Sequence, residues 1–485
     1  MPKKIYSSLI LLIYFPVYFA NPRVCLKFNH IRVIRVQMPK LCSFFGGLYV
    51  SSVGLDFGLH VSQLRGMISP SPEKSEIVIV GAGLAGYAAA VALAGTGASI
   101  IMLDRAPEGL GAAGHSDPRT TALSPSSFKM LSCLDVLSAC QDAPTPIAAM
   151  KITEAEAVPR WPGGSLDFGD AESDDALAYM VRNHDLHAAF AKVSKDIPNI
   201  SIRKGQAVTD IEQTQNGMRL AVNNTEIMCD LVVACDGRQS LIRDFLGMRI
   251  IKRDYRRAAL VADFSHSLPH DNIARQIFRA DGTLACLPLG KNLSGEYVSS
   301  LVWVEKTKTA ESLSALSPER FSHALSEKLD GALGDLEISD RPHCFPLTLM
   351  LAENYTAPHA VLLGDAAHVI HPLAGQGYNL TLRDAATLAE HVFEAKILGL
   401  KVCDMSVTEG YQLNRRADAF AMAGLTDGFN TMFGSSFLPL SWLRHAGLAL
   451  VNHTLPNQAK AAAQIYADRG ISPPPRLLRG HRLNG

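Results

Sequence analysis

The sequence lacks several features that would place it in other classes of protein. Its 46 basic residues equal its 46 acidic ones, so the formal net charge is zero and the electrostatics indicate no nucleic-acid partner. The nine cysteines are scattered, odd in number and free of any CxxC pair, which is typical of a reducing compartment and predicts no metal site. The 485 residues are nevertheless enough for two or three domains.

A dinucleotide-binding motif follows an apolar run. Residues 77–80 (IVIV) predict a short buried strand, and GAGLAG leads from it into the helical pattern YAAAVALAGTG. In this setting the first glycine makes the turn, the second admits a pyrophosphate, and the third lets helix and strand pack closely. A second predicted strand ends in a carboxylate about twenty residues on, where it would hold ribose hydroxyls. The candidate residues are Gly81, Gly83, Leu84, Ala85, Gly86, Asp104 and Arg105.

Two later segments carry further candidates. Arg119 lies in the polar loop of DPRTTALS, just before Ser124 and Pro125 begin a predicted helix. Such an arginine pairs with a cofactor phosphate, lies over a cofactor pocket or forms a surface salt bridge, and spacing alone leaves these alternatives open. Asp236 and Gly237 end another buried strand, at the strand end where ligands collect in doubly wound sheets.

The richest stretch is VLLGDAAHVIHPLAGQGYNLTLRDA, residues 361–385, which predicts a strand, a glycine turn, a small-residue loop and a helix. A carboxylate after the strand can accept hydrogen bonds from the hydroxyls of a bound polyol. The loop lets backbone N–H groups approach a flat ligand, and the helix directs its positive end there. These features predict a seat for a nucleotide cofactor whose ring gains negative charge on reduction; an ordinary strand, loop and helix is the alternative. The candidates are Gly364, Asp365, Pro372, Gly375, Gln376, Gly377 and Asn379.

The pattern predicts an α/β fold with a discontinuous Rossmann-like domain, whose parallel sheet carries a β-meander. From about residue 255 to 344 the period changes to two, which favours an inserted, mainly antiparallel substrate sheet, and the chain is largely helical after residue 385. The expected divisions are cofactor domain 76–180, its second part 181–250 with the start of the substrate layer, substrate sheet 251–345, third cofactor part 346–400, and C-terminal helices with a basic tail 401–485.

Four motifs stand in fixed order: GAGLAG with Asp104, DPRTTALS, ACDGRQS, and GDAAHVIHPLAGQGYNL followed by Asp384. This set resembles the flavin-dependent aromatic hydroxylases, and within them the ubiquinone-biosynthesis branch, of the 2-polyprenylphenol and 2-polyprenyl-6-methoxyphenol hydroxylase type. The likeness covers about residues 76–470. One departure is Thr381, where relatives often have glycine.

The resemblance implies a role for each candidate. The three motif glycines would cradle the FAD pyrophosphate, Asp104 the adenosine ribose, and Arg119 would contact the cofactor near the flavin entrance. Asp236 and Gly237 belong to a motif associated with both FAD and pyridine nucleotide. Asp365 would bond the ribityl chain, while the GQG loop and Asn379 approach the isoalloxazine edge. His368 and His371 flank this loop, but a histidine there is more often structural, so no catalytic acid or base is assigned.

The implied activity is that of a flavoprotein monooxygenase, in which NAD(P)H reduces FAD and a C4a-hydroperoxide transfers one oxygen of O2 to a phenol ring. The implied substrate is a polyprenylphenol, with peripheral membrane contact and membership of a ubiquinone-biosynthesis complex. The expected location is the cytoplasm, on the inner face of the membrane, or the mitochondrion in a eukaryote. Phe278, Leu287 and Trp303 are candidates for the apolar pocket, although they alternate as core residues do. The apolar helical segment 437–450 could dock on a membrane or on a sister hydroxylase. The favoured interpretation is that it packs on the rest of this protein.

Three alternatives remain open. The first is a catabolic hydroxylase of small aromatic acids, whose anionic substrate would need a positively charged pocket. The predicted sheet region contains no distinct cluster of basic residues. A flavin reductase or halogenase on this scaffold is the second, but the WxWxIP-like motif of halogenases is absent. The third is a non-catalytic member of a ubiquinone-synthesis assembly that binds FAD and lipid.

The first 75 residues differ from the rest. Lys3 and Lys4 precede an apolar run over 9–20 that Pro16 interrupts, and no acidic residue occurs before Asp56. The run is too short to span a membrane, and it fits a signal segment, a transit peptide or a start of translation at Met67. We favour the late start, since a cofactor enzyme of the cytosol follows, and expect residues 1–75 to be a disordered or mis-assigned extension.

Overall fold

The computed structural model describes eight stretches of the chain: residues 72–107, 117–154, 165–169, 176–223, 225–279, 281–371, 375–433 and 464–483. All of them belong to one compact unit, which comprises residues 72–485 and is separate from residues 1–71. Within these stretches, no helix has the length and apolarity needed to cross a membrane.

The first sheet is the parallel one that the sequence predicts. Strand β1 (Glu73–Val80) lies at its centre, where its apolar end is covered on both faces, as parallel sheets require. Among the described residues eight strands form this sheet, and β9 and β10 add an antiparallel meander. Its turn is at Gln215 and Asn216, one residue before the predicted Asn216 and Gly217, because Gly217 already pairs with Thr214. The other strands are β2 (Ile100–Leu103), β8 (Ile200–Arg203), β9 (Val208–Thr214), β10 (Gly217–Val222), β11 (Thr225–Ala234), β18 (Thr356–Ala357) and β19 (Ala360–Leu362).

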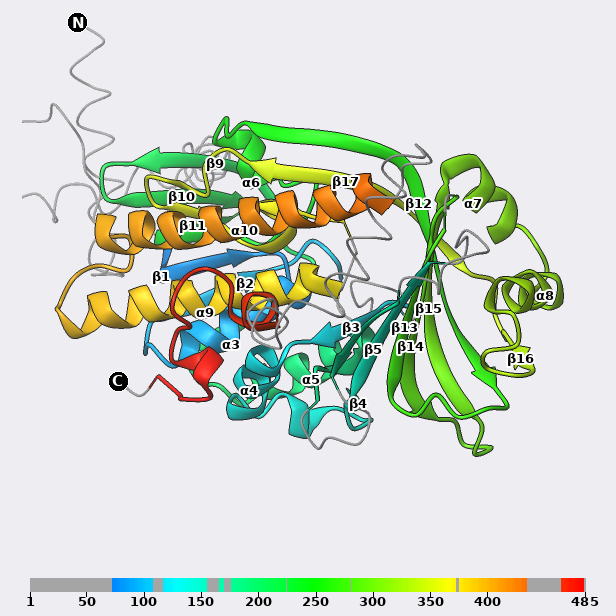
Figure 1. Ribbon diagram of the computed structural model, residues 1–485. Coiled ribbons are helices and arrows are strands. Elements are labelled where there is room, and N and C mark those ends of the chain that lie inside the picture. Colours follow the sequence, from blue (N-terminus) through cyan, green and yellow to red (C-terminus); the bar gives the residue numbers. More distant parts are fainter. Residues whose placement is uncertain are drawn as a thin grey trace, which may run out of the picture. The chain divides into compact units, whose positions relative to one another are not determined.

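Long helices pack beside this sheet (Figure 1). Helix α3 (Leu84–Ala94) is rich in alanine and almost wholly buried, so it approaches its neighbours closely. It contacts α5 (Asn183–Lys195) and α9 (Gln376–Ile397), and α9 in turn contacts α10 (Met405–Phe433). The apolar strands and these helices form the largest hydrophobic core.

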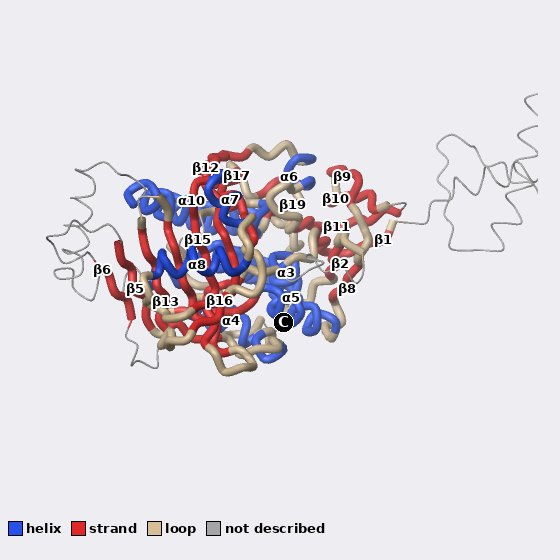
Figure 2. The backbone as a smooth tube through the Cα atoms, turned by 90° about the vertical axis from the view of Figure 1, so that its right-hand side faces the viewer, coloured by secondary structure: helices blue, strands red, loops and turns tan. Residues whose placement is uncertain are grey.

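The second sheet is mainly antiparallel and wider than residues 251–345, because β5, β6 and β20 join it from outside that range and β17 extends beyond its end. Strand β5 pairs with β13 in parallel, across more than one hundred residues of sequence. Figure 2 shows the strands side by side with α8 lying across them. The members are β5 (Ala149–Glu154), β6 (Ser165–Gly169), β12 (Ile250–His266), β13 (Ile273–Phe278), β14 (Thr283–Lys291), β15 (Tyr297–Lys306), β16 (Leu336–Glu337), β17 (His343–Ala352) and β20 (His368–Val369).

Alternation along these strands gives the second sheet two apolar faces. One face packs under α7 (Thr307–Ser314) and α8 (Pro318–Leu329) and includes Leu301 and Trp303. The opposite face includes Val302 and Val304 and lines a cavity. Trp303 is therefore a core residue, whose ring is tilted against that of Phe321 with centroids 5.6 Å apart, and the pocket role considered for it is wrong.

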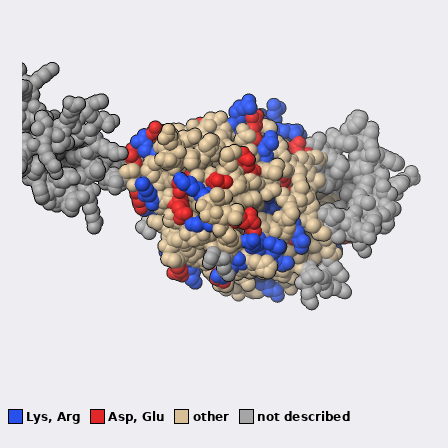
Figure 3. Space-filling view, turned by 90° about the vertical axis from the view of Figure 1, so that its left-hand side faces the viewer, with Lys and Arg blue, Asp and Glu red and all other residues tan. Residues whose placement is uncertain are grey.

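A small third sheet and short helices complete the described part. Ser124 caps α4 as predicted, because its hydroxyl accepts from the Ser127 N–H. Figure 3 shows basic and acidic side chains interspersed over the described residues of one face, as the zero net charge suggests. The remaining elements are β3 (Thr120–Leu123), β4 (Thr145–Ile147), β7 (Ala178–Arg182), α4 (Pro125–Cys133), α6 (Leu241–Phe245), η2 (Leu137–Ala139), η3 (Gly364–Ala366) and η5 (Leu477–Arg479).

Candidate functional site

A large cavity of about 1520 Å³ runs from the glycine turn after β1 to the inner face of the second sheet. This exceeds the roughly 300–1,000 Å³ of a typical single-ligand pocket, so it has room for a cofactor and a second molecule. At one end it is lined by the predicted cofactor residues of the first sheet. The predicted residues that line it are Gly83, Leu84, Ala85, Arg119, Gly237, Asp365, Gly375, Gln376 and Gly377.

The glycine turn has the geometry that the motif predicts. Gly81 has φ +103°, and a Cβ there would lie 2.5 Å from the Cys235 carbonyl oxygen. A Cβ on Gly86 would lie only 1.8 Å from the Gly81 carbonyl oxygen, so this glycine permits the close helix contact. Gly83 has open space around its Cβ position and forms the N-cap of α3 with no side-chain cap. The turn therefore presents free space and a positive helix end, which suit a pyrophosphate.

Asp104 lies just past the end of β2, beside this turn. Its Oδ2 accepts from the Ala82 N–H at 2.6 Å and its Oδ1 from the Ala106 N–H at 2.7 Å. These bonds fix the carboxylate next to the glycine turn and leave each oxygen with a further lone pair for a ribose hydroxyl. Arg105 is exposed. The roles of both residues stay predictions.

The end of β11 approaches the same turn. Asp236 accepts from the Ile242 N–H at 3.2 Å through Oδ2, whereas its buried Oδ1 has no partner among the described residues. Gly237 has φ +84° and lines the cavity. Arg243, which is buried, donates to the Ala366 carbonyl at 3.1 Å, and this bond ties α6 to the turn after β19.

The third cofactor segment forms the loop and helix start that the sequence predicts. The side chain of Asp365 is half exposed, lines the cavity and pairs with Arg238 at 3.2 Å. Helix α9 begins after Gly375, which has φ +61° and provides no side-chain cap, and no acidic residue lies in the first turn. The start of α9 thus forms a positive helix end at the cavity wall. Pro372 lies outside the described residues.

Asn379 is fully buried and uses its side chain inside the protein. Its Oδ1 accepts from the Ser124 N–H at 3.0 Å, and its Nδ2 donates to the Ala122 carbonyl at 2.9 Å. The side chain therefore fastens α9 to the β3–α4 turn and is absent from the cavity lining. Thr381 lies against Gly364, and a Cβ added to that glycine would lie 3.1 Å from the Thr381 Cγ2. The Thr381 hydroxyl donates to the Gly377 carbonyl at 3.3 Å.

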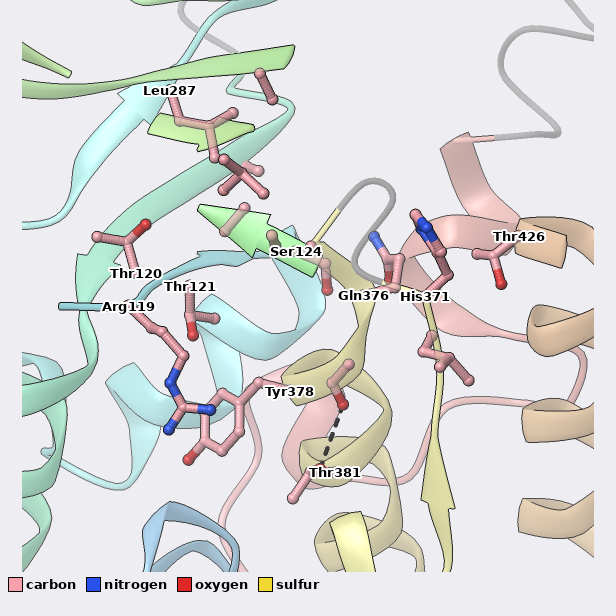
Figure 4. A pocket seen from close by; sticks show the side chains of 18 of the residues that line it. Arg119, Thr120, Thr121, Ser124, Leu287, His371, Gln376, Tyr378, Thr381 and Thr426 are labelled. Atoms are coloured by element: carbon pink, nitrogen blue, oxygen red, sulfur yellow. Dashed lines mark hydrogen bonds between the residues drawn. The ribbon is translucent and has the colours of Figure 1, made fainter. Parts of the chain in front are cut away.

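Arg119 lines the cavity with a half-exposed side chain (Figure 4). It forms a paired contact with Asp117, with Nε 2.8 Å from Oδ1 and Nη2 2.7 Å from Oδ2. Its guanidinium also lies 5.5 Å from the ring centroid of Phe345. This arrangement combines the salt bridge and the pocket position that the sequence left as alternatives.

A buried charge network lies beneath the cofactor loop. Asp384 accepts from the Arg415 Nε at 2.7 Å and from the His368 Nε2 at 2.6 Å. It also accepts from the Gly364 N–H at 3.1 Å. Burial alone would raise the pKa of Asp384, but His368 and Arg415 outweigh it and hold the pKa below its usual value.

Two more buried groups balance this network. Asp418 pairs with Arg383 at 3.0 Å and with Arg415 at 2.9 Å, so two arginines face two carboxylates. All four side chains are at most 3% exposed. The sequence showed Asp384 only as part of a motif, and its partners on α10 carried no signal of their own because only the packing of α9 on α10 brings them together.

His371 is the polar residue on the cavity wall that sequence reasoning left without a role. It is 1% exposed, and neither ring nitrogen has a hydrogen-bond partner among the described residues. Figure 4 shows its ring beside Gln376, with Thr426 of α10 nearby. Burial lowers the pKa of His371 to about 4, so the ring is neutral at physiological pH.

The far end of the cavity is apolar. Phe278 and Leu287 line it, as expected, and no described lysine, arginine or carboxylate of the second-sheet strands does. The lining from this sheet includes the apolar residues Ile152, Ala259, Val261, Phe278, Ala285, Leu287, Val302, Val304, Phe345 and Leu347, and the polar residues Gln276, Thr283, His343 and Thr348. This wall suits an apolar ligand better than an anion.

These residues fit an FAD molecule. The open space at Gly83 provides a phosphate cradle, and the accessible carboxylate of Asp365 provides an acceptor for hydroxyl groups. The uncapped start of α9 provides positive potential for a ring that gains negative charge.

Comparison with known proteins agrees with this fit. The sequence model of a family described as "FAD binding domain" matches residues 74–396. A second model, described as "Squalene epoxidase", matches residues 317–481. Ubiquinone hydroxylase UbiL of Rhodospirillum rubrum is 30% identical over 422 residues, which cover 86% of this chain and 95% of that protein. The 3-demethoxyubiquinol 3-hydroxylase of Escherichia coli is 29% identical, covering 78% of this chain and 94% of the relative.

Solved structures share the fold. The p-nitrophenol 4-monooxygenase PnpA of Pseudomonas putida superposes with a TM-score of 0.64 at 18% identity, covering 81% of this chain and 97% of that one. PqsL of Pseudomonas aeruginosa, described as a probable FAD-dependent monooxygenase, gives 0.63 at 18% identity, covering 78% and 100%. At these identities the likeness concerns the fold alone.

Proposed function

The chain belongs to the family of flavoproteins with this FAD-binding domain, which includes ubiquinone hydroxylases, and on that premise we propose that it hydroxylates the ring of a polyprenylated phenol in ubiquinone biosynthesis. FAD is the cofactor, NAD(P)H the electron donor and O2 the second substrate, as in other flavin-dependent monooxygenases. The observation that carries the choice of substrate is the apolar wall at the far end of the cavity.

The wall separates this proposal from its main alternative, a hydroxylase of small aromatic acids. A bound carboxylate needs a cationic or hydrogen-bonding partner when it is removed from water. Among the described residues, the sheet face of the cavity presents mostly aliphatic and aromatic groups, with Gln276, Thr283, His343 and Thr348 as its polar members, and no lysine or arginine. Arg119, the nearest candidate over Phe345, is already paired with Asp117. An isoprenoid chain meets the wall without an electrostatic penalty.

Each part of the chain then has a defined task. The glycine turn and Asp104 hold the dinucleotide end, Asp365 holds the polyol chain, and the start of α9 stabilises negative charge on the reduced ring. Bound FAD supplies the redox and oxygen-transfer chemistry. The second sheet holds the phenol against the cofactor end and excludes water from the reacting carbon.

The proposal includes peripheral contact with the membrane in which a polyprenylphenol resides, and assembly with other ubiquinone-biosynthesis enzymes. In a bacterium the inner face of the cytoplasmic membrane is the expected place, and in a eukaryote the mitochondrion. Flotation of the purified holoprotein with vesicles that contain prenylphenol, compared with vesicles that lack it, tests the membrane contact.

The decisive assay measures NAD(P)H oxidation by the FAD-loaded protein with a short-chain prenylphenol and with 4-hydroxybenzoate. We expect stimulation by the prenylphenol and incorporation of one atom of ¹⁸O2 into the product. Prompt turnover of 4-hydroxybenzoate alone would replace the proposal with the catabolic alternative. FAD binding with no phenol-stimulated oxidation would instead favour a non-catalytic role in the assembly. Quinone intermediates that accumulate in a strain without the protein would identify the ring position.

A further inference from the structure

The ring nitrogens of His371 have no hydrogen-bond partner among the described residues, and the ring lies on the cavity wall, where a ligand can supply one. Its side chain is 1% exposed, yet both Nδ1 and Nε2 lack hydrogen-bond partners among the described residues. A buried polar atom without a partner costs free energy, so such a group in a cavity wall points to a bound partner. His266 provides a contrast: it is equally buried, but its ring contacts the Leu268 carbonyl at 2.8 Å and the Ser299 hydroxyl at 2.9 Å.

The surroundings define what that partner is. His371 follows β20, at the edge of the second sheet, and lies beside Gln376 at the start of α9, so it stands between the apolar wall and the cofactor end (Figure 4). The ring of Tyr255 on β12 contacts it edge-on, with centroids 5.1 Å apart. A ligand that reaches both the wall and His371 must therefore combine a large apolar part with a small polar group.

Burial keeps His371 neutral, and the charged groups that face it have smaller, opposing effects on its pKa. Arg257 on β12 disfavours a positive imidazole, and Asp427 on α10 opposes that effect but is itself paired with Arg253 at 2.7 Å. Burial is the largest influence. A neutral imidazole has one acceptor nitrogen and one donor nitrogen. It thus accepts a hydrogen bond from a hydroxyl without placing a charge in the apolar part of the cavity.

We propose that His371 is a substrate-binding residue whose acceptor nitrogen receives the hydrogen bond of the phenolic O–H, and so sets which ring carbon faces the cofactor. This inference rests on the proposed function and names the residue that recognises the ring oxygen. The apolar wall provides affinity for the isoprenoid chain, whereas His371 provides orientation, because the hydrogen bond fixes the ring about the axis of the chain.

The test compares binding of 2-geranylphenol and of its methyl ether to the FAD-loaded protein, followed by the change in flavin absorbance. The ether keeps the shape and the chain but has no O–H donor. We expect the native protein to bind the phenol roughly 10- to 100-fold more tightly than the ether, as one buried hydrogen bond provides. His371→Leu is expected to bind both compounds alike, and His371→Asn or His371→Gln to restore part of the preference.

The variants also separate a ligand role from a structural one. Since His371 has no described protein partner, His371→Leu is expected to keep the melting temperature and the flavin content of the native protein. The matched control His266→Leu removes two contacts and is expected to lower the melting temperature while keeping the preference for the phenol. If His371→Leu fails to fold, His371 has a structural role and the inference is overturned.

The remaining outcomes distinguish this inference from the proposed function. If native protein turns over 2-geranylphenol but does not prefer it to the ether, or if His371→Leu keeps the preference, His371 does not recognise the hydroxyl although the hydroxylase activity stands. If native protein shows neither phenol-stimulated NAD(P)H oxidation nor phenol binding, the proposed function fails and the inference fails with it.

Discussion

Asp384→Asn is expected to destabilise the protein far more than loss of one ordinary surface charge. In the native protein this carboxylate lies among buried groups and accepts from Arg415, His368 and the Gly364 N–H. The substitution keeps the size of the side chain but leaves Arg383 and Arg415 with Asp418 as their remaining carboxylate. The amide also has only one acceptor atom, so the three donors cannot all be satisfied.

The magnitude follows from the burial. Removing one partner from a buried ion pair costs about 3–5 kcal/mol, because the remaining charge stays buried without compensation. With an unfolding entropy of about 2.1 cal/mol/K per residue over roughly 400 residues, 4 kcal/mol lowers Tm by about 5 °C. Flavin content should fall as well, since the Gly364 turn loses an anchor next to Asp365.

Urea unfolding and differential scanning fluorimetry of the FAD-free protein measure the stability, and flavin absorbance measures the cofactor content. The matched control is Asp427→Asn, which removes a partner of Arg253 from a half-exposed pair and should cost no more than about 1 kcal/mol. If Asp384→Asn costs no more than this control, the buried network does not contribute to stability as argued.

Three further predictions concern single positions. His371 stays neutral down to about pH 4 in the folded protein, whereas the unfolded state takes up its proton near pH 6.5. The free energy of unfolding should therefore fall by about 2 kcal/mol between pH 7 and pH 5 because of this residue. Urea titrations of His371→Leu should show that this loss is abolished. Thr381→Gly should cost roughly 1–2 kcal/mol, because a buried side chain and helix propensity are both lost, and thermal unfolding against Thr381→Ser checks it. Gly81→Ala should prevent folding, because the added Cβ would lie 2.5 Å from the Cys235 carbonyl oxygen. Gly83→Ala should fold with normal Tm, because there is open space around its Cβ position, but flavin titration should show weak FAD binding.

The sequence predicted those features that depend on neighbouring residues. The glycine turn and the Ser124 cap follow from local backbone rules, and the structure contains both. The predicted hairpin is also present, but its turn is at Gln215 and Asn216, one residue before the predicted position. The alternation in the second sheet was also visible. Which of its two faces would meet α8 was not visible, and this is why Trp303 was considered for the pocket although it belongs to the core.

Features that depend on distant pairing escaped prediction. Strand β5 joins β13 although helix α5 and four of the eight described strands of the first sheet lie between them in sequence, and no periodicity encodes that partner. The charge network is similar, because Arg415 and Asp418 face Asp384 only once α10 lies along α9. His371 was left as a structural histidine since sequence cannot show that its ring nitrogens lack partners in the folded chain.

Residues 360–397 connect the two sheets, and this gives the buried network a functional consequence. Strand β19 belongs to the parallel sheet, β20 pairs with β17 in the antiparallel sheet, and α9 returns to pack on α3. The same short segment therefore carries Asp365, the proposed cofactor ligand, and His371, the proposed substrate ligand. Asp384 holds this segment at Gly364, next to Asp365, and at His368, three residues before His371. Loosening it should change the distance between cofactor and phenol, so a folded Asp384 variant is expected to consume NAD(P)H with less hydroxylated product per turnover.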